Sequence, residues 1–285
     1  MNDNTTLSNS LKFICLDLFY NSNIGYDESK YYIEQLEHDK SYGFYLPKNL
    51  ELTMENLYFS FQISTILGIN FDLISMYFDE LERTLTPKQE IVSFSEMYYF
   101  NLLLKNTDNN YPVLEKINSK SVGKAKDYIK KNEVNDENFI HNYYAFKIML
   151  DSGETEFVED NLSYLENFVE ETKNLYPNEP SVHYIGALYQ ELISKMSNFN
   201  LSERELNNII ANLPDNPFYL NTVYKYIEIL IRKDFTLSYD VKNEVYNRIK
   251  GYKTINGFSP EIDMGYTTIL STYYGLTITG LLEND

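Results

Sequence analysis

The sequence predicts an all-α protein built from about six helical hairpins. Two observations lead to this fold class: an aromatic-led segment with helical periodicity recurs along the 285 residues, and a more charged amphipathic segment lies between successive copies. In addition, no long run alternates apolar and polar residues, so few strands are expected, or none.

The recurring aromatic segments are expected to form inner helices. Each has a tyrosine followed by apolar residues three and four positions apart, and its apolar arc is wide enough to be covered on most sides. The equivalent tyrosines are separated by 40, 45, 41, 40 and 49 residues. They are Tyr58, Tyr98, Tyr143, Tyr184, Tyr224 and Tyr273.

The charged segments are expected to form outer helices, because their apolar residues fall on one stripe and Glu, Asp and Lys lie opposite. Turn signals rich in Pro, Asn and Gly separate them from the inner helices. Few Gly (11) or Pro (8) occur and no stretch resembles a linker, so residues 1–285 are expected to form a single domain, with 1–25 as an opening helical segment. The outer segments span 28–38, 73–85, 121–132, 158–175, 202–213 and 240–252.

Composition excludes several classes of partner. The formal net charge of −18 argues against nucleic acids and anionic membrane surfaces, which bind to stripes of Lys and Arg. One cysteine, Cys15, favours the reducing cytoplasm. The amino terminus has no export-signal pattern and the apolar runs are too short for a membrane span, so a cytoplasmic protein is expected.

The first and last copies carry a Gly-Phe loop ahead of the inner helix, in "YGFYLPKNLELTMENLYFSFQISTILG" (42–68) and "NGFSPEIDMGYTTILSTYYGLTITGLL" (256–282). This unit resembles the repeat of the protein prenyltransferase β subunit and of the squalene and terpene cyclases. The resemblance implies an α/α toroid, in which inner helices surround a central cavity, outer helices face solvent, and the first turns of the inner helices form one rim. Gly275 stands where a small residue would let two inner helices approach.

The residues that the resemblance requires for catalysis differ in this chain. A zinc-dependent prenyltransferase would have a His before Thr272, where this chain has Ser271, and an Asp-x-Cys pair, whereas Cys15 precedes Asp17. The Asp-x-Asp-Asp-Thr string of the cyclases does not occur either. Three or four converging ligands are needed for zinc, so neither a metal nor another cofactor is predicted.

Four residues are candidates for catalysis. Glu96, His141 and His183 fall in the first turns of inner helices, and they would share a rim if the toroid closes. A carboxylate beside neutral imidazoles suits a general acid or base; alternatively, all three only form hydrogen bonds with helix termini and tyrosines. Asp263 in "SPEID" fits a cavity mouth, but it equally fits a cap at a helix start.

The six equivalent tyrosines are candidates for ligand binding. Their ring faces would suit an apolar or cationic ligand, and the competing interpretation is packing between inner and outer helices.

Three hypotheses for function follow. The first is a protein that binds an apolar small molecule or peptide in an aromatic-lined central cavity. The second is an isoprenoid-processing enzyme, terpene cyclase-like or prenyltransferase-like, that uses a non-standard acid. The third is a helical-repeat scaffold whose acidic surface binds a basic protein.

Overall fold

The computed structural model describes residues 53–66, 73–84, 91, 93–107, 110–196, 219–232, 238–254, 257–262 and 268–283. Of these residues 78% are helical, which confirms the all-α fold class. The predicted opening segment 1–25, the outer segments 28–38 and 202–213, and Asp263 lie outside the described residues.

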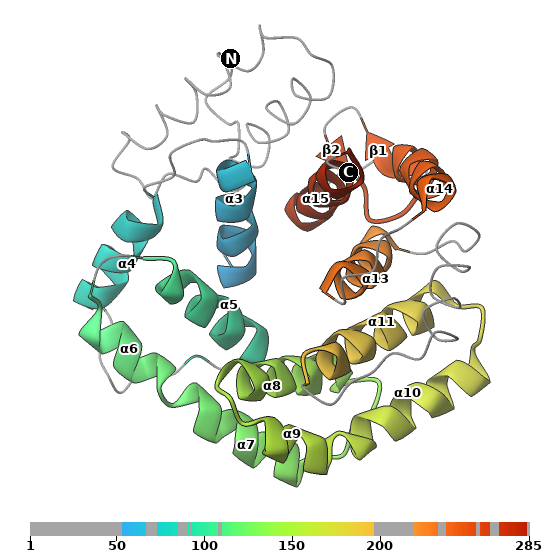
Figure 1. Ribbon diagram of the computed structural model, residues 1–285. Helices are drawn as coiled ribbons and strands as arrows, with labels where there is room; N and C mark the ends of the chain where they lie inside the picture. The colour runs from blue at the N-terminus through green and yellow to red at the C-terminus, as the bar shows by residue number, and fades with distance from the viewer. Residues whose placement is uncertain are drawn as a thin grey trace, which may run out of the picture. The chain divides into compact units, whose positions relative to one another are not determined.

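All six predicted inner helices are present, and Figure 1 labels each of them. They are α3 (Met54–Ile66), α5 (Phe94–Lys105), α8 (Phe139–Asp151), α11 (Pro180–Ser194), α13 (Leu220–Arg232) and α15 (Ile269–Glu283). The remaining helices are α4 (Leu73–Thr84), α6 (Pro112–Asn118), α7 (Ser121–Lys131), α9 (Thr155–Asn161), α10 (Ser163–Leu175), α14 (Tyr239–Ile249) and the 3-10 turn η1 (Lys250–Tyr252).

The chain divides into two compact units that share its carboxy-terminal part. Unit 1 comprises Met1–Lys120, Thr254–Phe258 and Thr267–Tyr273, and unit 2 comprises Ser121–Lys253, Ser259–Tyr266 and Tyr274–Asp285.

In unit 1, α3 packs on α5, and α6 packs on both α4 and α5. Glu82 of α4 caps α6: its two carboxylate oxygens accept the backbone N–H groups of Val113 and Leu114 at 2.8 and 3.0 Å. These bonds satisfy donors that a helix start leaves without an intrahelical partner. The core of this unit includes Leu57, Ile63, Phe78, Phe100, Leu103 and Leu114.

In unit 2, α7 packs on α8 and α10 packs on α11, while α8, α11 and α13 lie next to one another (Figure 1). Helix α7 buries Ser121, Ala125 and Ile129, four residues apart, whereas α8 buries most of its length. The prediction of narrow apolar stripes on outer helices and wide apolar arcs on inner ones is therefore confirmed for this pair.

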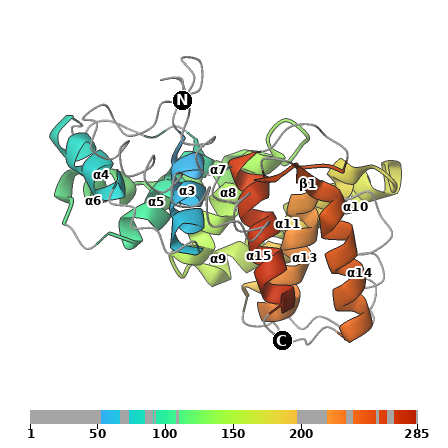
Figure 2. The ribbon, with the colours of Figure 1, turned by 90° about the horizontal axis from the view of Figure 1, so that it is seen from above.

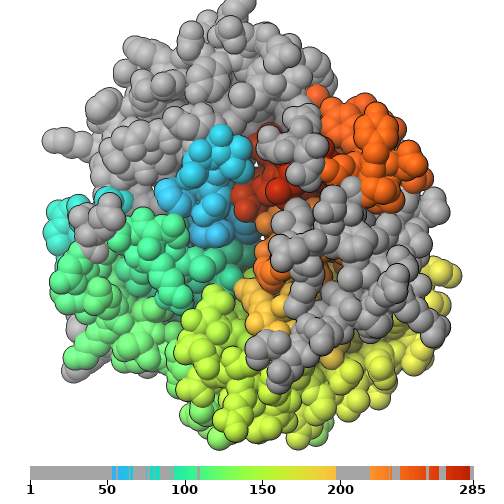
Figure 3. Space-filling view, viewed as in Figure 1, coloured from blue at the N-terminus to red at the C-terminus, as the bar shows by residue number. Residues whose placement is uncertain are grey.

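Helices α8 and α11 of unit 2 run parallel. Contacts between α8 and α11 advance along both helices, from Lys147–Glu191 to Asp151–Lys195. Figures 1 and 2 show α11, α13, α14 and the end of α15 side by side, and in the space-filling view α7 to α10 form a continuous face of this unit (Figure 3).

Helix α8 ends in a Schellman motif. The N–H groups of Gly153 and Glu154 donate to the carbonyls of Leu150 and Met149, each at 3.0 Å. Gly153 has a φ of 83°, a conformation that glycine adopts without steric cost.

The Gly-Phe loop of the last repeat has a defined structural role. Strand β2 (Gly257–Phe258) pairs with β1 (Lys253–Thr254) in the small two-stranded sheet. The buried Phe258 donates its N–H to Thr272 Oγ1 of α15 at 3.3 Å, which joins the loop to the first turn of that helix.

Candidate functional site

A buried ion-pair centre joins three inner helices of unit 2. Glu191 of α11 is 1% exposed, and it lies between Lys147 of α8 and Lys225 of α13, which are 5% and 7% exposed. Lys147 Nζ lies 3.0 Å from Glu191 Oε1, and Lys225 Nζ lies 2.8 Å from Glu191 Oε2. One buried carboxylate therefore forms ion pairs with two buried lysine side chains.

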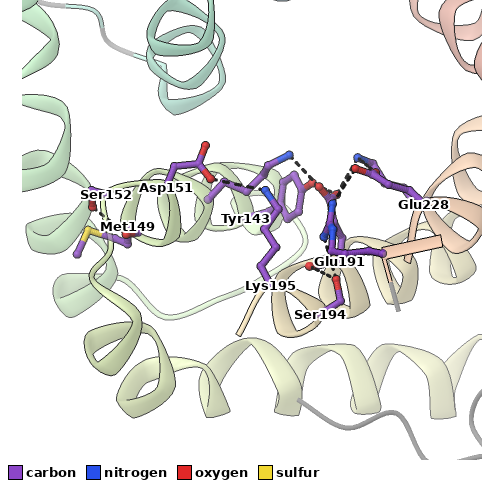
Figure 4. Close-up of polar contacts among 11 residues, drawn as sticks. Tyr143, Met149, Asp151, Ser152, Glu191, Ser194, Lys195 and Glu228 are labelled. Atoms are coloured by element: carbon purple, nitrogen blue, oxygen red, sulfur yellow. Dashed lines mark hydrogen bonds and ion pairs between the residues drawn. The ribbon is translucent and has the colours of Figure 1, made fainter. Parts of the chain in front are cut away.

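The centre extends toward the surface through α13. Lys225 Nζ also lies 3.5 Å from Glu228 Oε2, and Glu228 Oε1 lies 2.8 Å from Arg232 Nη2. Arg232 Nη1 donates to Ser194 Oγ at 3.1 Å, and this hydroxyl donates to the Glu191 carbonyl at 2.8 Å. Figure 4 shows Tyr143 pointing from α8 toward Glu191, to which its hydroxyl donates.

The two lysines differ in their electrostatic surroundings. Burial lowers the pKa of Lys147 below its ordinary value, and the attraction of Glu191 offsets this only in part. Burial also disfavours a charged Lys225, but Glu191, with smaller contributions that include Glu228, holds its pKa well above the ordinary value. The shifts have opposite signs although the lysines share one carboxylate: the charge of Lys225 adds to burial in lowering the pKa of Lys147, whereas Glu191 outweighs burial at Lys225.

Glu191 stays ionised at neutral pH. Burial alone would raise its pKa, but Lys147 and Lys225 outweigh burial and hold the pKa of this carboxyl well below its usual range. Burial, reinforced by the charge of Glu191, raises the pKa of Tyr143 well above its ordinary value, so this phenol remains a neutral donor.

Further tyrosines surround the ion pairs. Tyr274 of α15 stacks on Tyr224 of α13, with ring centroids 4.2 Å apart and planes 17° apart. Burial raises the pKa of Tyr274 well above its ordinary value. The charge of Lys225 opposes this shift, and the phenol groups of Tyr184 and Tyr144 add to it. Tyr143, Tyr224 and Tyr274 are buried, whereas Tyr144 and Tyr184 are half-buried. We call these five tyrosines with Lys147, Glu191 and Lys225 the tyrosine–lysine centre.

Three of the six predicted ligand-binding tyrosines thus belong to this centre: Tyr143, Tyr184 and Tyr224. Tyr143 does not lie beside Tyr184 but donates to Glu191, which is seven residues further along α11. The ring of Tyr184 lies 6.5 Å from that of Tyr219, measured between centroids. The equivalent tyrosines of α8 and α11 are therefore offset along their helices by about two turns.

The other three predicted tyrosines belong to an aromatic cluster in unit 1. Tyr58 lies 5.5 Å from Tyr99, Tyr98 lies 5.3 Å from Tyr99, and Tyr273 lies 5.1 Å from Phe59, measured between ring centroids. Tyr98 is buried, and Tyr58 and Tyr273 are half-buried.

The candidate catalytic residues take part in local contacts. Glu96 Oε2 accepts the N–H of Met54 at 3.0 Å and so caps α3 within unit 1. His141 lies against Tyr128 of α7, with centroids 5.0 Å apart, and burial lowers its pKa. Burial, followed by the charge of Lys173 on α10, lowers the pKa of His183. Each histidine thus interacts with the outer helix next to it, His141 with Tyr128 of α7 and His183 with Lys173 of α10.

Sequence reasoning missed Lys147, Glu191 and Lys225. The signal was a charged residue within a helix that is otherwise apolar, since Lys and Glu are rarely fully buried unless they are paired. In "HNYYAFKIML", "YIGALYQELI" and "VYKYIEILI" these three residues interrupt the apolar arc.

Among the described residues no three His, Cys, Asp or Glu side chains converge on a possible metal site. The described helices include none with both the length and the hydropathy needed to cross a bilayer. Comparison with known proteins gave no match to a family model, a curated protein or a solved structure.

Proposed function

We propose that the chain is a binding protein that holds an apolar small molecule or a peptide against the tyrosines of its inner helices. The observation that supports this most directly is the tyrosine–lysine centre: half-buried Tyr144 lies 5.0 Å, between ring centroids, from Tyr143, which donates to the buried Glu191, and Tyr144 and half-buried Tyr184 both raise the pKa of buried Tyr274. Ring faces beside a few fixed polar groups are typical of small-molecule sites.

We propose also that the inner helices close into an α/α toroid, so that these tyrosines line a central cavity. Parallel inner helices with outer helices packed behind them, as in unit 2, are compatible with that architecture. Small-angle scattering of the full-length chain tests it: a closed toroid of 285 residues should have a radius of gyration of about 19 Å. An elongated particle with a clearly larger radius would exclude the closed ring.

Ligand binding can be tested with the protein's own fluorescence. The chain has 27 Tyr and no Trp, so its intrinsic emission comes from tyrosine alone. Native mass spectrometry of the full-length protein should detect a co-purifying ligand, and titration with n-dodecanol should change the tyrosine emission. Replacing Tyr144 or Tyr184 by Ala should weaken dodecanol binding by about five-fold, since one aromatic contact contributes on the order of 1 kcal/mol.

The matched control is Tyr164→Ala, because Tyr164 lies on α10 and is 57% exposed. Its replacement should leave dodecanol binding unchanged. The proposal fails if no ligand co-purifies and dodecanol does not bind, or if Tyr144→Ala, Tyr184→Ala and the control all bind equally.

A further inference from the structure

Helix α10 exposes several apolar side chains in addition to the ones it buries. Leu165 and Val169 are buried, but Tyr164 and Leu175 are 57% and 70% exposed, and Tyr176, directly after the helix, is 57% exposed. The other exposed large apolar residues among those described lie singly, on α3, α8, α14 and α15 and in the loop after β2. A single exposed apolar residue is ordinary, whereas a group of them on one helix is typical of an interaction surface.

Tyr164 and Leu175 lie on the same side of α10. They are 11 residues apart, so at 3.6 residues per turn their directions differ by about 20° and they are about 16 Å apart along the helix axis. Glu171, which is also exposed, follows Tyr164 by seven residues and points within about 20° of the same direction. An apolar side chain therefore lies at each end of the row and a carboxylate lies between them. We call Tyr164, Glu171 and Leu175 the α10 stripe.

The surface around the α10 stripe is acidic. Within α9 and α10 six carboxylates are exposed, against one exposed basic side chain, that of Lys173. The chain as a whole has a net charge of −18, so the local and the overall field both attract a cationic partner and repel an anionic one. Glu166 also forms a hydrogen bond with Tyr189 of α11. The six carboxylates belong to Glu156, Glu159, Asp160, Glu166, Glu170 and Glu171.

Contacts within the chain show how such a surface binds a lysine-bearing helix. Helix α7 has basic residues in its last turn, and Lys126 Nζ lies 3.0 Å from Glu154 Oε2 at the start of α9. The Nζ atoms of Lys126 and Lys130 also lie 4.9 and 5.7 Å from the ring centroid of Phe157. Lysines one turn apart thus contact a carboxylate and an aromatic face together. The α10 stripe offers the same two groups on an exposed surface.

We propose that the α10 stripe is a docking surface for a basic amphipathic helix of another protein. Apolar side chains of that helix contact Tyr164 and Leu175, and its lysines or arginines pair with Glu171 and the neighbouring carboxylates. The surface lies on an outer helix, whereas the tyrosine–lysine centre lies on inner helices. The inference is therefore separate from the proposed binding of an apolar ligand.

Titration calorimetry of the full-length chain with designed peptides tests the inference. The probe is the acetylated and amidated peptide LKKLLKLLKKLLKL, which has leucines on one face of a helix and lysines on the other. The same peptide with glutamate in place of every lysine keeps the apolar face and reverses the charge. The lysine peptide should bind at least ten-fold more tightly than the glutamate peptide, and raising NaCl from about 0.05 M to about 0.5 M should weaken its binding about ten-fold.

Replacement of apolar residues locates the site. Tyr164→Ala combined with Leu175→Ala should weaken binding of the lysine peptide about ten-fold, because both apolar contacts are lost. The control is Tyr239→Ala on α14, where the side chain is 78% exposed, and it should leave binding unchanged. All three side chains are more than half exposed, so these replacements should leave the fold intact.

Replacement of carboxylates tests the charge at the same place. Glu170→Gln combined with Glu171→Gln should weaken binding of the lysine peptide about five-fold. The matched control is Asp240→Asn combined with Glu244→Gln, which removes two exposed carboxylates from α14 and changes the net charge by the same amount. This control should change the affinity by less than two-fold.

Failure of the lysine peptide to bind, or equal binding of the two peptides, would overturn the inference. Equal effects of the α10 and α14 variants would show attraction by the overall charge alone and would also overturn it. Sedimentation of the full-length chain tests the alternative occupant: self-association that Tyr164→Ala with Leu175→Ala abolishes would identify a second copy of the chain and overturn the assignment to another protein. Dodecanol binding is measured separately, so each of these results leaves the proposed binding function standing.

Discussion

Replacing Glu191 by Gln should destabilise the protein strongly, because the neutral amide leaves two buried ammonium groups without their shared counter-charge. At an effective dielectric constant of about 20, each ion pair near 3 Å corresponds to roughly 5 kcal/mol before desolvation is subtracted. Breaking a buried pair by removing one partner typically costs about 3–5 kcal/mol. We expect a loss of that size in the free energy of unfolding at pH 7.

The decisive comparison is with a variant that removes the whole centre. Tyr143→Phe, Lys147→Met, Glu191→Leu and Lys225→Met combined remove the three buried charges of this centre and the phenol that donates to Glu191. Apolar replacement of a buried ionic group is often neutral or stabilising by about 1–4 kcal/mol. The quadruple variant should therefore be more stable than Glu191→Gln, although it carries more substitutions.

Urea denaturation followed by circular dichroism measures both effects on the full-length chain. Glu171→Gln is the control, since Glu171 is exposed on α10 and should shift stability by less than about 0.5 kcal/mol. A Glu191→Gln variant as stable as this control would show that the ion pairs contribute nothing. A quadruple variant less stable than Glu191→Gln would refute the reasoning that the unpaired charges cause the loss.

Three further predictions use the same denaturation assay. The stability difference between the unmodified chain and Glu191→Gln should be complete above about pH 4.3, the unfolded pKa of Glu, and should shrink as the pH falls through the lower folded pKa of Glu191; a constant difference down to pH 2 would contradict this. Glu82→Ala should cost about 1–2 kcal/mol, because two backbone N–H groups at the start of α6 lose their acceptors; an unchanged midpoint would show that water replaces the carboxylate. Gly153→Ala should destabilise by about 1 kcal/mol because φ is 83° there, whereas Gly123→Ala, in open space on α7, should stabilise by up to about 1 kcal/mol; shifts of the same sign would contradict the backbone argument.

The periodic helices could be predicted from sequence because their pattern is local. Apolar residues three and four apart fix which face of a helix is buried, and this was sufficient for all six inner helices. The helix expected over 158–175 is instead divided into α9 and α10 around Leu162, where neither Gly nor Pro marks the break. Helix α6 was missed because seven residues are too few to establish a period, although Pro112 stands at its start.

The tyrosine–lysine centre could not be assembled in the same way, since its partners lie far apart in sequence. Lys147 and Glu191 are 44 positions apart, and their meeting depends on the offset between α8 and α11. Local pattern places each residue on a helix face without fixing the relative height of two helices. Glu96 lies in the first turn of its helix, as predicted. Its carboxylate, however, accepts from the backbone N–H of Met54 at the start of the preceding inner helix, a contact that the sequence pattern did not indicate.

The contrast between the centre and the rest of the chain favours a role beyond stability. The sequence has 42 acidic and 24 basic residues, yet α8, α11 and α13 bring two lysines and one glutamate together in the interior of unit 2. Well-packed apolar residues can stabilise a core as well as buried ion pairs do, so stability alone does not require Lys147, Glu191 and Lys225. A quadruple variant that retains its stability but no longer binds dodecanol would separate these two roles within one protein.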